Sequence, residues 1–99
     1  MRSWSAAIPT ALLIAGCASS YSPEARTVTE AHKSEVKNCE HLGPVQGSAS
    51  GFHWSESEAM QSARNRALEQ AHGMEASHVV WQHIEEDRTP RVQGEAYQC

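Results

Sequence analysis

The sequence predicts a small α+β domain in which a sheet of three or four strands carries one helix on one face. Three observations favour this fold. Residues 55–72 lack proline and glycine and have apolar residues at helical spacing, and residues 77–85 and 91–99 have the composition of strands. A shorter strand pattern precedes the helix. The predicted order is therefore strand, helix, strand, strand, after a disordered N-terminal tether.

Length and charge limit the classes of protein to consider. The chain has 99 residues, of which 39% are apolar, so it holds one domain with a thin core. After position 16 it carries twelve acidic residues against seven Lys and Arg, a net charge of −5, without a basic stripe. This balance disfavours nucleic-acid binding and a polybasic membrane patch.

The first sixteen residues are typical of a bacterial lipoprotein export signal. Arg2 precedes an apolar run over residues 6–15 that is too short to cross a bilayer. Residues 13–17, Leu-Ile-Ala-Gly-Cys, resemble a lipobox. We expect cleavage between Gly16 and Cys17 and a thioether from Cys17 to diacylglycerol, with two or three acyl chains as a stable anchor. The alternative is an ordinary secretory signal that contains a cysteine by chance.

The residues after the lipobox predict the address and the tether. In the enterobacterial sorting pattern that this segment resembles, Asp after the cysteine retains a lipoprotein in the inner membrane, and Ala18 and Ser19 stand there instead. We therefore expect the periplasmic face of the outer membrane. Residues 17–37 are polar and predict a flexible tether, about 25 Å long as a coil, in which residues 26–29 could add a short edge strand.

The head is expected over residues 38–99. Its first strand covers residues 39–48, with a kink or bulge at Gly43 and Pro44. Ser55 and Glu58 fit a helical capping box, and Gly73 is the expected left-handed C-cap. Along the helix a narrow stripe of mostly small apolar residues is expected to face the sheet: Met60, Ala63, Ala67, Leu68, Ala71 and Met74.

Two cysteines remain after Cys17, and an exported protein lives in an oxidising compartment. The crossover through the helix makes the first two core strands parallel, and a tight turn makes the third antiparallel to both. If the third strand lies beside the first, Cys39 meets Cys99, and we expect a disulfide. The alternative is a zinc or copper site built from Cys39, His41 and Cys99, with His53 or another histidine added.

No catalytic constellation is evident in the sequence. The six histidines form no recognised set of metal ligands, and residues 34–37 match a serine-lysine motif by letters alone. We therefore expect a non-enzymatic protein with no cofactor, and no small-molecule substrate is identified.

Three segments carry a resemblance to a known family. These are Cys-x-x-Leu-Gly-x-Val-x-Gly at 39–47, Ala-His-Gly-Met at 71–74, and Gly-Glu-Ala-Tyr-Gln-Cys at 94–99. Together with the lipobox they resemble the DUF4156 lipoproteins and, more distantly, the outer-membrane stress-sensor lipoproteins of the Rcs pathway. In the first group a bridge between the first and last cysteines is implied. The stress sensors have four domain cysteines, a Pro-rich tether and a basic character, so this chain departs from them.

The function expected from these observations is that of a non-enzymatic outer-membrane lipoprotein. Its head would act as a periplasmic protein-interaction module or envelope-stress accessory. The expected partners are the membrane, through the lipid anchor, and other envelope proteins. A metal-binding or metal-responsive lipoprotein is the alternative.

Overall fold

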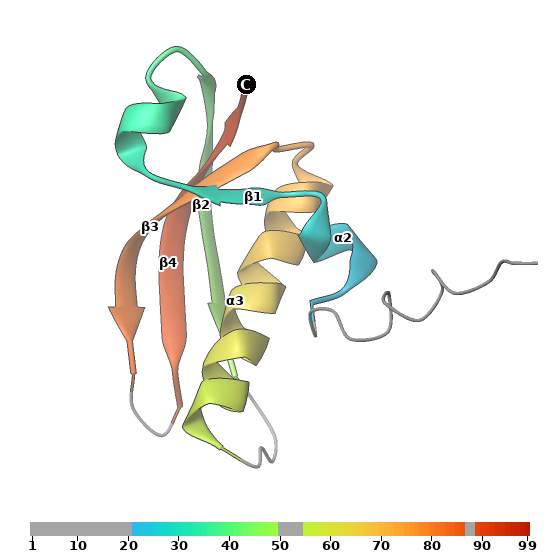
Figure 1. Cartoon of the computed structure of the whole chain (residues 1–99), viewed down its shortest axis with the longest axis vertical. Helices are drawn as coiled ribbons and strands as arrows, with labels where there is room; N and C mark the ends of the chain where they lie inside the picture. Colours follow the sequence, from blue (N-terminus) through green and yellow to red (C-terminus); the bar gives the residue numbers. More distant parts are fainter. Residues whose placement is uncertain (1–20, 50–54, 87–88) are drawn as a thin grey trace, which may run out of the picture.

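The computed structural model describes residues 21–49, 55–86 and 89–99, and it confirms the α+β class. A four-stranded sheet carries one long helix on one face (Figure 1). In chain order the elements are α2 (Pro23–Arg26), β1 (Thr29–Ala31), the 3-10 helix η1 (Lys33–Val36), β2 (Glu40–Ser48), α3 (Glu56–Gly73), β3 (His78–Glu85) and β4 (Arg91–Gln98).

The sheet has the strand order β1-β3-β4-β2. β4 lies in the interior and runs antiparallel to both β2 and β3. The last strand therefore lies beside the first core strand, which is the condition on which the expected disulfide depends. β1 adds a short parallel edge strand, with Thr29 opposite His78 and Ala31 opposite Val80.

The expected flexible tether is wrong for residues 21–37, which are folded. The Ser22 side chain caps α2 by accepting a hydrogen bond from the backbone N–H of Ala25 at 3.1 Å. The backbone N–H of Ser22 donates to Asn65 Oδ1 of α3 at 2.8 Å. Ala25 and Val28 are buried in the main core. The segment has few apolar residues, but they bury against elements that come later in the chain, which local composition does not reveal.

The predicted irregularity in β2 is confirmed. The register with β4 shifts between His41 and Gly43, and Gly43 has φ of 144°. Glycine suits this position because a side chain there is strained. A second shift occurs in β3 between Trp81 and His83, and the sequence analysis did not predict it.

The N-terminal cap of α3 is as predicted, whereas the C-terminal cap lies two residues further on. Ser55 Oγ accepts a hydrogen bond from the backbone N–H of Glu58 at 3.1 Å. Gly73 is still helical, and Glu75 is the residue with positive φ, 64°. The N–H of Ala76 donates to the carbonyl of Ala71 at 3.0 Å, which closes a Schellman motif around Glu75.

Small residues bring α3 close to β2. The stripe predicted to face the sheet does so, with Ala63, Ala67, Leu68 and Ala71 fully buried. At Gly47 a Cβ would lie 2.1 Å from the carbonyl oxygen of Ala63 and 2.8 Å from the backbone nitrogen of Ala67. A side chain has no room there, so the glycine sets the distance between helix and strand.

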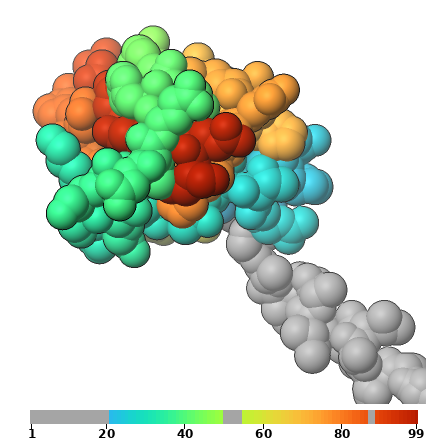
Figure 2. Space-filling model, turned by 90° about the horizontal axis from the view of Figure 1, so that it is seen from above, coloured from blue at the N-terminus to red at the C-terminus, as the bar shows by residue number. Residues whose placement is uncertain are grey.

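The predicted disulfide is present between Cys39 and Cys99, whose Cα atoms lie 4.4 Å apart. It joins the start of β2 to the end of β4, next to the paired residues Glu40 and Gln98. Figure 2 looks onto this end of the molecule, where the green β2 and the red end of the chain meet. The disulfide therefore links the edge strand β2 covalently to the interior strand β4.

Replacing both bridge cysteines by serine should lower the free energy of unfolding by about 4 kcal/mol, because the bridge closes a long loop in the unfolded chain. The sequence separation is 60 residues. Urea unfolding of the double variant measures the loss, with the wild-type domain under reducing conditions as a second reference. An unchanged urea midpoint in both would contradict a stabilising bridge.

Gly47→Ala should lower the free energy of unfolding by at least about 2 kcal/mol, because the added methyl collides with the backbone of α3. Gly73→Ala is the matched control, since a Cβ there meets nothing within 4 Å. The control should keep or raise stability, because alanine is the better helix former. Equal destabilisation by the two variants, measured by chemical unfolding, would rule out the close contact as the cause.

Candidate interaction face

The register of the sheet separates its two faces. Residues that pair across β2, β4 and β3 form rows, and successive rows point to alternate sides of the sheet. The rows Val45–Gly94–Trp81 and Gly47–Val92–Ile84 lie on the side of α3. The rows between them point to the opposite side, where α3 does not lie: Pro44–Glu95–Val80, Gln46–Gln93–His83 and Ser48–Arg91–Glu85.

We call this second side the open face and define it by Gln46, His83, Glu85, Arg91, Gln93 and Glu95. Four of these residues are exposed, and the two glutamates are half-buried. An antiparallel sheet with one packed and one solvated face shows this alternation of apolar and polar rows. The rows Gln46–Gln93–His83 and Ser48–Arg91–Glu85 therefore form a continuous polar surface across three strands, whereas in the row Pro44–Glu95–Val80 only Glu95 is polar and Val80 is buried.

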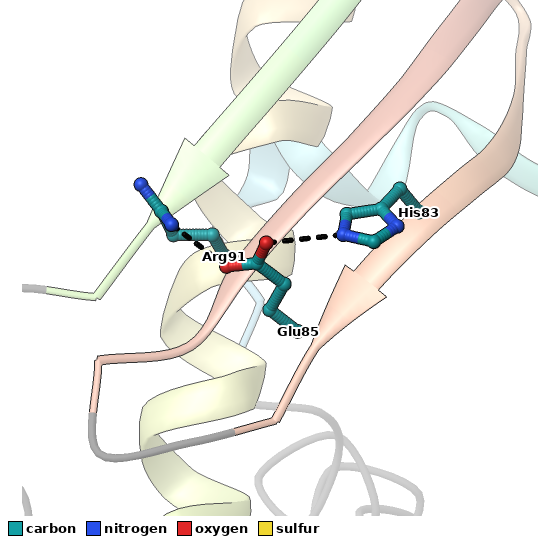
Figure 3. Close-up of polar contacts among 3 residues, drawn as sticks. All are labelled: His83, Glu85 and Arg91. Carbon is teal, nitrogen blue, oxygen red and sulfur yellow. Dashed lines mark hydrogen bonds and ion pairs between the residues drawn. The ribbon is translucent and has the colours of Figure 1, made fainter.

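An ion-paired cluster occupies one end of the open face (Figure 3). Arg91 donates from Nη2 to Glu85 Oε1 at 2.8 Å and from Nε to the same oxygen at 3.1 Å. His83 Nε2 lies 3.1 Å from the other carboxylate oxygen of Glu85. The Arg91 hydrogen bonds, followed by the contact with His83, lower the pKa of Glu85 below its usual value. The Glu85 carboxylate thus lies between the side chains of Arg91 and His83, and contact with both favours its ionised form.

A second pair lies at the other end of the face. His41 of β2 contacts the carboxylate of Glu95 on β4 through its Nε2 atom. The ring of His41 also lies near the ring of Tyr97, with centroids 5.2 Å apart. Glu95 pairs with Pro44 and Val80 and lies two residues from Gln93 along β4. Its side chain is therefore on the same side of the sheet as the cluster.

Two hollows open to solvent at the side of β2. The larger, about 690 Å³, is lined by residues of β2, β3, β4 and α3 that include Gln46, Gln70, Arg91 and Gln93. The smaller, about 300 Å³, includes Gln82 and Glu95. Gln70 Oε1 accepts the backbone N–H of Gln46 at 2.8 Å. Amide and charged groups dominate these surfaces, which suits hydrogen bonding to a polar partner.

The residues predicted as site residues are placed as follows. Gly16, Cys17 and His53 lie outside the described residues. Cys39 and Cys99 are bonded to each other, so the alternative ligand set with His41 lacks two thiolates in this structure. Within residues 21–49, 55–86 and 89–99, no group of three His, Cys, Asp or Glu side chains could hold a metal ion.

The open face was not predicted from the sequence. A signal was present: residues 91–97 alternate strictly, with Val92, Gly94 and Ala96 between polar or aromatic neighbours. From the sequence, this segment was predicted only to be a strand. Which polar residues of the other strands lie beside it depends on the register.

These observations define a class: a small disulfide-closed α+β module with one sheet face under a helix and a polar open face. The chain belongs to the family described as Domain of unknown function (DUF4156), whose profile matches residues 19–99. No curated protein and no solved structure showed a significant match. Among the described residues no helix is long and apolar enough to span a membrane.

Arg91→Gln should raise the pKa of Glu85 towards its usual value, because it removes the strongest cause of the depression. His83→Gln is the matched control and should raise it less. A carboxylate with a lowered folded-state pKa stabilises the protein above its unfolded-state pKa, and this contribution is lost as pH falls through the folded-state pKa. An NMR titration of the Glu85 carboxyl measures its pKa in each variant. A larger rise in the His83 variant than in the Arg91 variant would show that Arg91 is not the main cause of the lowered pKa.

Proposed function

We propose that this protein is a non-enzymatic outer-membrane lipoprotein whose periplasmic head binds another envelope protein through the open face. In this role it would serve as a protein-interaction module or an accessory of the envelope-stress response. The observation that carries the proposal is the continuous polar surface across β2, β4 and β3, on a fold whose other sheet face is used for packing.

Two observations support the lipid anchor. The lipobox at residues 13–17 provides small residues before the thiol that the lipid transferase requires. The family match begins at residue 19, so it covers the chain only after the expected cleavage site. Acyl chains on Cys17 would hold the head at the membrane, since each buried CH2 contributes about 0.8 kcal/mol.

The composition of the open face supports a protein partner. It combines acids, bases and amides, with Arg91, Gln46 and Gln93 exposed. Protein interfaces use such mixed donors and acceptors, and arginine is enriched in them. A net charge of −5 after position 16, without a basic stripe, does not suit a polyanion. We therefore expect a folded envelope protein that presents both donors and acceptors.

Site-specific photo-crosslinking in intact cells tests the proposal. A photoreactive residue at Gln93 or Gln46 should give the same discrete adduct, because these two positions are register partners on the open face. Glu69, exposed on α3, is the matched control and should not give it. An equal yield of the adduct from Glu69 would contradict binding through the open face.

A charge swap adds a second arm to this experiment. The double variant Glu85→Arg with Arg91→Glu keeps an ion pair within the head but exchanges the charges that a partner meets. We expect the adduct to fall at least about tenfold, as for a loss of about 1.4 kcal/mol, while the unfolding midpoint changes little. Full retention of the adduct in the folded double variant would overturn the proposed surface.

A further inference from the structure

The folded part of the chain begins unexpectedly close to the expected lipid. Tyr21 packs against the main core, and the backbone of Ser22 is tied to Asn65 in the middle of α3. Only Ala18, Ser19 and Ser20 stand between Cys17 and Tyr21. Four residue steps reach at most about 14 Å even in a fully extended chain.

The membrane itself takes up part of that reach. A glyceride on Cys17 lies beneath the polar headgroups, a layer of roughly 5–7 Å on each side of a bilayer. The remaining length above the lipid surface is then less than about 10 Å. A coil of some twenty residues would have allowed the head to stand well clear of the leaflet, and the fold of residues 21–37 removes that freedom.

The attachment point lies on the helix side of the sheet. Tyr21 lines a hollow of about 410 Å³ together with Glu56, Met60 and Arg64 of α3 and with Glu86 and Pro90 at the base of the last hairpin. α2, which follows Tyr21, also packs against α3. We call the linker of Ala18, Ser19 and Ser20 the leash, and we call this surface the leash face. The open face lies on the other side of the sheet.

We propose that the leash face lies against the lipid leaflet and that the open face consequently points away from the membrane. The proposal rests on the lipidation of Cys17 in the proposed function. Its occupant is the lipid surface, because a leash this short brings the surface around Tyr21 to the headgroups. Glu56 and Glu86 stand on the leash face with Arg64, so its charge does not attract anionic lipid. The leash, and not adsorption, sets the orientation.

Short-range quenching in reconstituted vesicles tests this orientation. The full lipidated protein is labelled with a fluorophore at Glu56→Cys on the leash face or at Gln93→Cys on the open face, both exposed positions. The vesicles contain phosphatidylethanolamine and phosphatidylglycerol with a nitroxide on a fraction of the headgroups. We expect at least about twofold stronger quenching at position 56, because the leash limits how far that surface can rise. Equal quenching at the two positions, or stronger quenching at position 93, would overturn the proposal.

A longer leash provides the control. Insertion of twelve Gly and Ser residues between Ser19 and Ser20 should abolish most of the difference, because the head can then turn freely. A difference that persists would mean that the head adheres through its own surface and would contradict the leash mechanism. Incorporation of an alkyne-labelled fatty acid into the protein is measured in parallel. No incorporation in the wild type, or incorporation that does not depend on Cys17, would defeat the proposed function itself, whereas an acylated protein with equal quenching defeats the orientation alone.

Discussion

The close contact between α3 and β2 is the constraint on which the rest of this structure depends. Gly47 leaves no space between the strand and the backbone of Ala63 and Ala67, so helix and sheet pack at short distance. Large side chains are not needed to fill the layer between them, which suits a chain with few of them. α3 covers one face of the sheet, and the opposite face carries the two polar rows.

A core this thin needs support from outside the helix–sheet layer, and the chain supplies it in two ways. The bridge between Cys39 and Cys99 ties the edge strand β2 to the interior strand β4. Residues before β2 add apolar side chains at Ala25 and Val28, and β1 extends the sheet beside β3. Residues 21–37, which composition assigned to a tether, are therefore part of the domain, and only Ala18, Ser19 and Ser20 separate them from Cys17, the residue proposed to carry the lipid.

The features predicted correctly from sequence are those written in local patterns. The helix from Ser55, the three core strands, the irregularity near Gly43 and the pairing of the cysteines follow from caps, spacing and topology. The edge strand expected at residues 26–29 lies instead at Thr29–Ala31. Residues 21–37 were wrongly predicted to be a flexible tether, because their burial depends on α3, which is distant in sequence. The left-handed residue at the end of the helix was wrongly predicted to be Gly73. It is Glu75, a residue type that does not favour positive φ. The cluster of Glu85, Arg91 and His83 depends on a register that includes a bulge in β3, which composition does not specify.

In the proposed arrangement the head is anchored with one side near the leaflet, and the polar face on the other side is available for contact with envelope proteins. Everything in this account of function requires that the chain is exported and acylated. The intact mass of the protein extracted from membranes without reduction tests this most directly. We expect a chain that begins at Cys17, carries two or three acyl chains and lacks the two thiol hydrogens of Cys39 and Cys99. A full-length chain with its leader attached, or an unmodified thiol at position 17, would contradict it.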